Sequence, residues 1–302
     1  MNVLLAIPAK GQNKYIEEMV SAIDAMSVKP FHVLYMADRP SPAERVEALK
    51  LIGKSSLVEY YPISSKPSYV GRPQMVVGAD WFLTGNVRNQ AVAYIEAHPE
   101  IDAVVFIDGD CIPEKDLIKA HMEQLDRPDP CVSVGQRKEA MYSWQDQRMT
   151  DESDCHIFKE VPTEVDNEGM FVDSGVVWTC NFGMNRAALA SLKQLNNTLY
   201  GRAETFSSDF LGTWGGEDGF IGLECFYTKI PVIALGQGDN GIRHKMHLRD
   251  EAKYNHVAFI NYLEEQRERL MYLLDLHKLN ARNYKYIRRE QLILKGYDYR
   301  QA

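Results

Sequence analysis

The stretch VVFIDGDCIP, residues 104–113, is an apolar run that ends abruptly on two carboxylates separated by one glycine. The apolar part indicates a buried strand, and the turn after it would need only one Asp and a Gly. Asp108 and Asp110 together are compatible with a solvated turn or with a divalent-cation site. Hard cations prefer carboxylate oxygens, and Gly109 would let both side chains approach one ion. The stretch alone leaves both interpretations open.

Strand and helix signals alternate in the first third of the chain. Apolar runs predict buried strands at 2–9, 31–38, 57–63 and 102–108. Helical spacing of apolar residues predicts helices at 14–27, 41–52 and 86–97, the second opened by Ser41 as a cap and Pro42 in the first turn. This alternation predicts an α/β fold with a mostly parallel sheet flanked by helices.

Polar residues follow three of these strands. Lys10 comes after the first, Asp38 ends the second, and Asp108 and Asp110 close the fourth. Ligands of parallel sheets bind at the carboxyl ends of the strands, so we expect these side chains to share one crevice.

The later part of the chain is less regular. Residues 136–175 are polar and acid-rich and are expected to form a long loop. Strand-then-helix patterns follow at 176–189, a turn leading into a helix at 209–229, and a strand at 230–235. We therefore expect one domain over 1–252, with halves 1–110 and 111–252, and a helical, basic, Tyr-rich extension over 253–302.

Composition narrows the class of protein. The 302 residues carry a formal net charge of −8, which does not suggest a nucleic-acid partner for the body of the chain. Residues 276–302, however, hold seven Lys and Arg against two acids.

Five scattered cysteines indicate free thiols in a reducing compartment. With no signal-peptide pattern and no apolar run of about 20 residues, a cytoplasmic protein is expected.

A second cluster, WGGEDGF, spans residues 214–220. Gly215 and Gly216 can adopt backbone conformations closed to other residues. Glu217 and Asp218 would then begin a helix, where the helix dipole stabilises negative charge. The pattern is also that of an ordinary helix start, but Trp214 adds a flat face suited to stacking on a sugar ring.

A third cluster, GIRHKMHLR at 241–249, contains His244 and His247. Two carboxylates without an imidazole would suit Mg²⁺, whereas an added histidine favours Mn²⁺ or a similar transition ion.

In this order, the three clusters resemble the GT-A glycosyltransferases that use nucleotide sugars. More narrowly they are similar to glycosyltransferase family 2 and to the WGGED-type beta-1,4-galactosyltransferase and chondroitin-synthase-type domains. AIPAKGQ (6–12), GNVRNQAVAY (85–94) and CNFGMNRAAL (180–189) extend the resemblance, which covers roughly residues 2–250.

The resemblance implies a role for each matching residue. Asp218 would be the catalytic base and Glu217 would bind the acceptor or donor sugar, while the acceptor side would include Asn181 and Gly216. Asp108, Asp110 and His244 would hold the metal, with His247 as runner-up. The donor nucleotide sugar would contact Pro8, Lys10, Asp38, Arg88, Asp108, Gly109, Asp110 and Trp214. Two departures stand out: Asp38 lies in MADRPS rather than in a doubled-acid pattern, and Gly241 takes the place of a Met ligand.

The implied activity is metal-dependent, inverting transfer of a sugar from a UDP-sugar to an acceptor hydroxyl, with Mn²⁺ or Mg²⁺ as cofactor. The acceptor is open: a glycan, a lipid-linked saccharide with the tail near a membrane surface, or a hydroxymethylated DNA base as in phages. The oligomeric state is open too.

Two other classes of protein are alternatives to a glycosyltransferase. A sugar-nucleotide nucleotidyltransferase would normally carry a glycine-rich loop after the first strand, and PAKGQNKY has one glycine. A non-catalytic nucleic-acid or partner-binding module is motivated by the tail.

Overall fold

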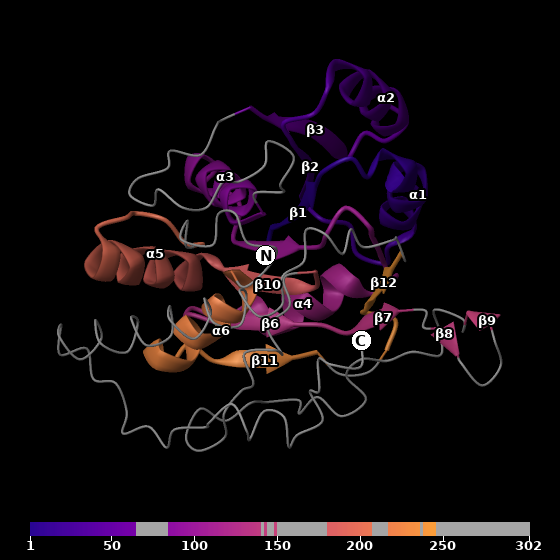
Figure 1. Ribbon diagram of the computed structural model, residues 1–302. Helices are drawn as coiled ribbons and strands as arrows, with labels where there is room; N and C mark the ends of the chain where they lie inside the picture. Colours follow the sequence, from indigo (N-terminus) through magenta and orange to yellow (C-terminus); the bar gives the residue numbers. More distant parts are fainter. Residues whose placement is uncertain are drawn as a thin grey trace.

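The computed structural model describes residues 1–64, 84–139, 142–143, 148–149, 180–206, 217–235 and 238–245. Within these ranges the chain forms a twisted sheet with helices on both faces, as predicted (Figure 1). None of the helices in the described ranges is long and apolar enough to cross a membrane.

The first half follows the predicted alternation of strands and helices. Ser41 caps its helix in a capping box with Glu44, and Pro42 occupies the first turn, as the sequence predicts. The elements are β1 (Val3–Ala9), α1 (Ile16–Ala25), β2 (His32–Asp38), α2 (Pro42–Ile52), β3 (Val58–Ile63), α3 (Thr84–Ala97) and β4 (Ala103–Phe106), with the short 3₁₀ helix η1 (Asn13–Tyr15) before α1.

The second half adds three strands to the same sheet. Its order is β11-β6-β10-β4-β1-β2-β3, and β10 runs antiparallel to both of its neighbours. The elements are α4 (Leu117–Leu125), β6 (Val132–Val134), β10 (Phe182–Asn185), α5 (Arg186–Tyr200), α6 (Glu217–Thr228) and β11 (Val232–Ala234). The sequence predictions did not include α4 or β6.

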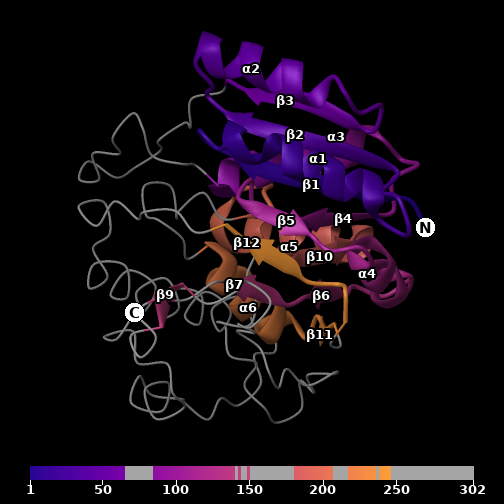
Figure 2. The ribbon, with the colours of Figure 1, turned by 90° about the vertical axis from the view of Figure 1, so that its right-hand side faces the viewer.

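A small second sheet stands beside the main one. Its order is β5 (Cys111–Pro113), β12 (Ile242–His244) and β7 (Arg137–Glu139), and Figure 2 shows β5 and β12 side by side. The prediction of a loop over 136–175 was therefore wrong at its start, because β7 pairs in parallel with β12. Two-residue strands β8 (Tyr142–Ser143) and β9 (Arg148–Met149) pair further along the same segment.

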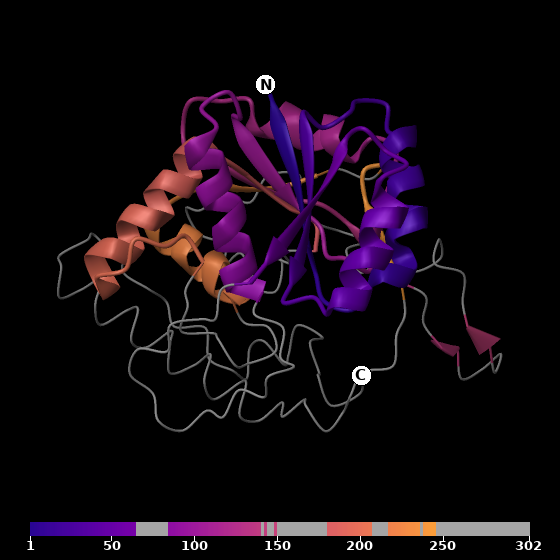
Figure 3. The ribbon, with the colours of Figure 1, turned by 90° about the horizontal axis from the view of Figure 1, so that it is seen from above.

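Two apolar layers enclose the main sheet. α1, α2 and α4 cover one face, with Ile16, Met19 and Leu117 fully buried. α3, α5 and α6 cover the other with Val87, Leu192 and Ile221. Figure 3 shows the indigo helices on one side of the sheet and α3 and α5 on the other. The predicted extension 253–302 lies outside the described residues.

One polar cluster is buried inside this core. His121 of α4 lies 2.7 Å from the Ser133 hydroxyl and 2.8 Å from Oδ1 of Asn181. Gly183 makes room for it, because a Cβ there would lie 2.6 Å from Ser133 Oγ and 2.7 Å from His121 Nδ1. Burial lowers the pKa of His121 from 6.5 to about 4, although the hydrogen bond with Asn181 opposes the shift.

This pKa predicts a loss of stability in mild acid. As pH falls below 6.5 the unfolded chain protonates His121 while the folded chain does not, so the unfolded state binds more protons and is favoured. Between pH 7 and pH 5 this histidine should remove roughly 2 kcal/mol of unfolding free energy. Urea unfolding of the wild type and of His121→Gln at both pH values measures it. The stability advantage of the wild type should shrink by that amount, and an advantage independent of pH would contradict the assignment.

Candidate active site at the carboxyl edge of the sheet

The two acids of the opening stretch lie in the loop between β4 and β5, at the carboxyl edge of the sheet. The backbone N–H of Gly109 donates to the carbonyl of Pro8 at 2.9 Å, which fastens this loop to the end of β1. A Cβ on Gly109 would lie 2.7 Å from the Cβ of Ala9, so the approach requires glycine. Pro8 and Gly109, both predicted donor-site residues, therefore shape the loop through their backbones.

Asp108 is held by a buried cation. The guanidinium of Arg88, on α3, is 1% exposed and donates through Nη2 to Asp108 Oδ1 at 2.9 Å. A buried charge is tolerated only when it is paired, so Arg88 fixes Asp108 in place. The Asp108 side chain keeps 32% of its surface exposed. One side of the Asp108 carboxylate is thus held by Arg88, and the other side is exposed to solvent.

Asp110 is almost buried and is contacted from three directions. Gln12 donates to its Oδ2 at 2.9 Å, and the thiol of Cys111 donates to its Oδ1 at 3.5 Å. His244 Nε2 lies 3.6 Å from Oδ2. The Asp110 carbonyl also accepts from the N–H of Lys245 at 2.8 Å, which ties the loop to the end of β12.

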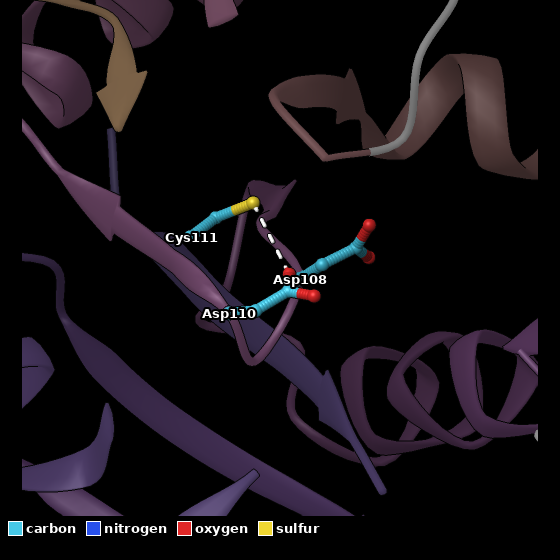
Figure 4. A group of neighbouring side chains, drawn as sticks. All are labelled: Asp108, Asp110 and Cys111. Atoms are coloured by element: carbon cyan, nitrogen blue, oxygen red, sulfur yellow. Dashed lines mark hydrogen bonds between the residues drawn. The ribbon is translucent and has the colours of Figure 1, made fainter. Parts of the chain in front are cut away.

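A cluster of ligand atoms results. One side-chain ligand atom each of Asp108, Asp110 and Cys111 lies within 4.8 Å of the other two, and the two carboxylates point to the same side of the loop (Figure 4). Burial raises the pKa of Cys111 well above its ordinary value, so it is a neutral thiol. The oxygens of Asp108 and Asp110, with His244 beside them, make a donor set suited to Mn²⁺ or Mg²⁺.

Register in the small sheet explains how His244 reaches this place. β12 pairs antiparallel with β5, with His244 opposite Cys111. The structure thus brings His244 to within 3.6 Å of Asp110, one of the two acids with which motif resemblance grouped it. Arg137, on β7, donates to His244 Nδ1 at 3.1 Å. Because a guanidinium only donates, this contact leaves the hydrogen of the neutral ring on Nε2, the atom facing Asp110.

Asp38 lies on the same edge and is contacted by two cationic side chains, those of Lys10 and Arg39. Its carboxylate is 0% exposed, accepts two 2.9 Å hydrogen bonds from Arg39, and lies 3.6 Å from Lys10 Nζ. Arg39 adopts a left-handed backbone with φ of 47°, a strained conformation for a residue other than glycine. The side chains of Lys10 and Arg39 are partly exposed, whereas the carboxylate that they contact is not.

The predicted base lies at the start of α6, which begins at Glu217 and Asp218 as the sequence predicted. Asp218 is half-buried in the first turn, where the helix dipole stabilises its charge. Asn181 is buried, and its amide is used internally: Oδ1 faces His121, and Nδ2 donates to the Gln136 carbonyl at 2.9 Å. Trp214, Gly216 and His247 lie outside the described residues.

Sequence reasoning missed three residues of this edge: Gln12, Arg39 and Arg137. Gln12 stands in the AIPAKGQ stretch that was recognised, but only the fold shows its amide reaching Asp110. Arg137 fell inside the expected loop.

Solved structures share this fold. No protein-family model matches the chain, and no curated protein does either. Staphylococcus aureus TarS 1–349 in complex with UDP-GlcNAc is 16% identical with a TM-score of 0.57, over 94% of this chain and 68% of that one. The chain spans 59% of a second TarS 1–349 structure and 36% of a longer TarS structure, the latter 17% identical over 79% of this chain with a TM-score of 0.50.

A third similar structure is glucosyl-3-phosphoglycerate synthase from Mycobacterium tuberculosis with Mn²⁺, UDP and phosphoglyceric acid. It is 11% identical with a TM-score of 0.49, over 88% of this chain and 78% of that one. The likeness to TarS establishes the fold, and the GT-A architecture predicted from the sequence is confirmed.

The contact between Gly109 and β1 predicts a cost for any side chain at this position. Gly109→Ala should lower the free energy of unfolding by roughly 1–3 kcal/mol, because the added Cβ would overlap that of Ala9. Gly238→Ala is a matched control, since the nearest atom to its Cβ would be 3.7 Å away. Urea unfolding of the two variants measures the difference. Equal stabilities would show that the loop is not packed against β1 as described.

Proposed function

We propose that the protein is a metal-dependent glycosyltransferase that moves a sugar from a UDP-sugar to an acceptor hydroxyl. One observation carries the proposal: Asp108 and Asp110 present their carboxylates together at the carboxyl edge of the sheet, and His244, from a segment far away in the sequence, lies 3.6 Å from Asp110. The GT-A fold supports it, since a TarS structure with this fold holds UDP-GlcNAc.

The residues at this edge fit a cation and a diphosphate. Asp108, Asp110 and His244 would hold Mn²⁺ or Mg²⁺, which when bound neutralises the negative charge that develops on the UDP leaving group. His244 as a third donor favours Mn²⁺. Binding through Nε2 would require that nitrogen to be free of hydrogen, so Arg137 would have to turn away from Nδ1. Its guanidinium would then donate to a phosphate oxygen of the donor.

Around the metal site the chain supplies further positive charge. Lys10 and Arg39 stand partly exposed at the ends of β1 and β2, on the same edge as Asp108. We infer that they contact the nucleotide, with Asp38 orienting both of them from behind. In this arrangement the donor contact expected of Asp38 would be made through Lys10 and Arg39.

Asp218 is proposed as the catalytic base. It would take the proton of the acceptor hydroxyl as that oxygen attacks the anomeric carbon, while the bond from the anomeric carbon to the diphosphate oxygen breaks and UDP leaves with the electron pair. A single displacement inverts the anomeric carbon. Glu217 and Trp214 are proposed to bind the sugars, Gly216 to leave room for the acceptor, and His247 to be the alternative metal ligand.

The acceptor is proposed only as a class: a hydroxyl of a glycan, of a lipid-linked saccharide or of a hydroxymethylated DNA base. These can be told apart by mass detection of the product on a panel that pairs several UDP-sugars with each acceptor type. A nucleotidyltransferase would instead release pyrophosphate from a nucleoside triphosphate and a sugar phosphate.

Replacing the base should separate binding from chemistry. Asp218→Asn should bind UDP with Mn²⁺ within about threefold of the wild-type affinity, because Asp218 is assigned no contact with the metal. Its turnover of the UDP-sugar should fall by a factor of about 10² or more, since general-base catalysis contributes on that order. Calorimetry and UDP-release kinetics measure the two quantities, with Asp126→Asn on the exposed end of α4 as control. Near-normal turnover would rule out Asp218 as the base.

A further inference from the structure

Glu114, the residue after β5, binds both backbone groups of Gly241, the residue before β12. The N–H of Glu114 donates to the Gly241 carbonyl at 3.0 Å, and Oε2 of the Glu114 carboxylate accepts from the N–H of Gly241 at 2.9 Å. In a regular antiparallel pair this second bond would go to the Glu114 carbonyl. That carbonyl instead accepts from the N–H of Leu117 at 3.3 Å, where α4 begins. The Glu114 side chain therefore continues the pairing with β12 after the backbone has turned toward the helix.

The second oxygen of the same carboxylate reaches β7. Oε1 of Glu114 accepts from the ammonium group of Lys138, and the two side chains are only 13% and 12% exposed. Because β12 lies between β5 and β7, the Glu114 carboxylate spans the small sheet at the point where β12 enters it. Hydrogen bonds to an ionised carboxylate are stronger than those between neutral groups. A Cβ on Gly241 would lie 3.0 Å from Oε2, so the glycine leaves room for this carboxylate.

The register of β12 decides which of its side chains faces the candidate metal site. His244 lies 3.6 Å from Asp110. The residues on either side of it, Arg243 and Lys245, contact Glu18 of α1 instead, at 3.7 Å and 2.8 Å. Successive side chains of a strand point to opposite faces, so a slip of one residue would turn His244 away and place a cationic side chain beside Asp110. A cation at that place would oppose the binding of a metal ion.

The sequence of β12 is too short to fix this register by itself. The strand has three residues, of which Ile242 is fully buried and apolar, and register is weakly specified where the hydrophobic pattern is short. At the far end of β12, the N–H of Lys245 donates to the Asp110 carbonyl, but that bond comes from the loop that carries the metal-site acids. Glu114 holds the near end from outside this loop. The position of His244 is therefore anchored on both sides.

We propose that Glu114 is a positioning residue that sets the register of β12 and so places His244 against a divalent ion held by Asp108 and Asp110. The inference rests on the proposed function and deepens it, because it assigns how the third donor is supplied. An imidazole donor favours Mn²⁺ over Mg²⁺, so Glu114 governs the metal preference of the site through a contact made at Gly241.

The test compares two variants of Glu114 with a control. Glu114→Ala removes both carboxylate oxygens, whereas Glu114→Gln keeps an acceptor for the Gly241 N–H on a side chain of the same length. Glu96→Ala is the control, because Glu96 of α3 forms an ion pair with Lys193 of α5 at 2.5 Å, away from the small sheet. All proteins are compared at a temperature where thermal melting shows each one fully folded.

Calorimetry measures the affinity for Mn²⁺ and for Mg²⁺, each in the presence of UDP. In Glu114→Ala the affinity for Mn²⁺ should fall about tenfold or more, the lower end of the loss expected when a residue that orients a metal ligand is removed. The affinity for Mg²⁺ should stay within about threefold, since this ion is bound through oxygen ligands. Glu114→Gln and Glu96→Ala should keep the wild-type preference. An unchanged Mn²⁺ affinity in Glu114→Ala, or equal losses for both ions, would overturn the proposal.

Pulsed electron paramagnetic resonance supplies a readout that needs no turnover. The nitrogen modulation from an imidazole bound to Mn²⁺ should be present in the wild type and in Glu114→Gln, and lost or strongly weakened in Glu114→Ala. If the three spectra behave so but the wild type turns over no UDP-sugar, the proposed transfer fails and the positioning role stands. If the wild type is active and Glu114→Ala gives the same nitrogen signal, the positioning role is wrong and the proposed function stands.

Discussion

The buried ion pair between Arg88 and Asp108 is the constraint on which the candidate site depends. A buried guanidinium is costly unless it is paired, so the ion pair holds α3 and the loop after β4 to each other. That lock decides where Asp108 lies, and Gly109 packs the same loop against β1. The Phe206 ring, which follows α5 in the chain, then packs against Arg88 and joins the same assembly. The pairing of the buried Arg88 with Asp108 thus holds residues from β1, α3, β4 and the second half of the chain at one place.

The small sheet completes the site from the other side. β12 lies between β5 and β7, and this order places His244 against Asp110 and Arg137 against His244. Backbone pairing over three residues is weak by itself, but the Lys245 N–H bound to the Asp110 carbonyl extends it to the loop. The residues of the candidate metal site are therefore fixed by backbone register as well as by side-chain contacts, so they need little rearrangement to bind an ion.

The sequence predicted the part of the fold whose periodicity is long and clear. Strands β1 to β4 have apolar runs, and α1 to α3 have helical spacing or a cap such as Ser41. β6 and β7 are three residues long, which is too short for an alternation of apolar and polar residues to be recognised. The polar residues around β7 were interpreted as a loop. At the candidate site, Asp108, Asp110 and His244 were predicted as metal ligands from motif resemblance. The positions of Gln12 and Arg39 depend on a contact between segments distant in sequence and on backbone geometry, which no local pattern encodes.

The central claim is that Asp108, Asp110 and His244 bind one divalent ion together with UDP. Pulsed electron paramagnetic resonance of Mn²⁺ with UDP and the protein tests it directly, because a coordinated imidazole gives a nitrogen modulation that water and carboxylate ligands do not. The wild-type protein should show that modulation, His244→Gln should lose it, and Asp110→Asn should no longer bind Mn²⁺ with UDP. A wild-type spectrum without the nitrogen signal, or one unchanged in His244→Gln, would contradict the site.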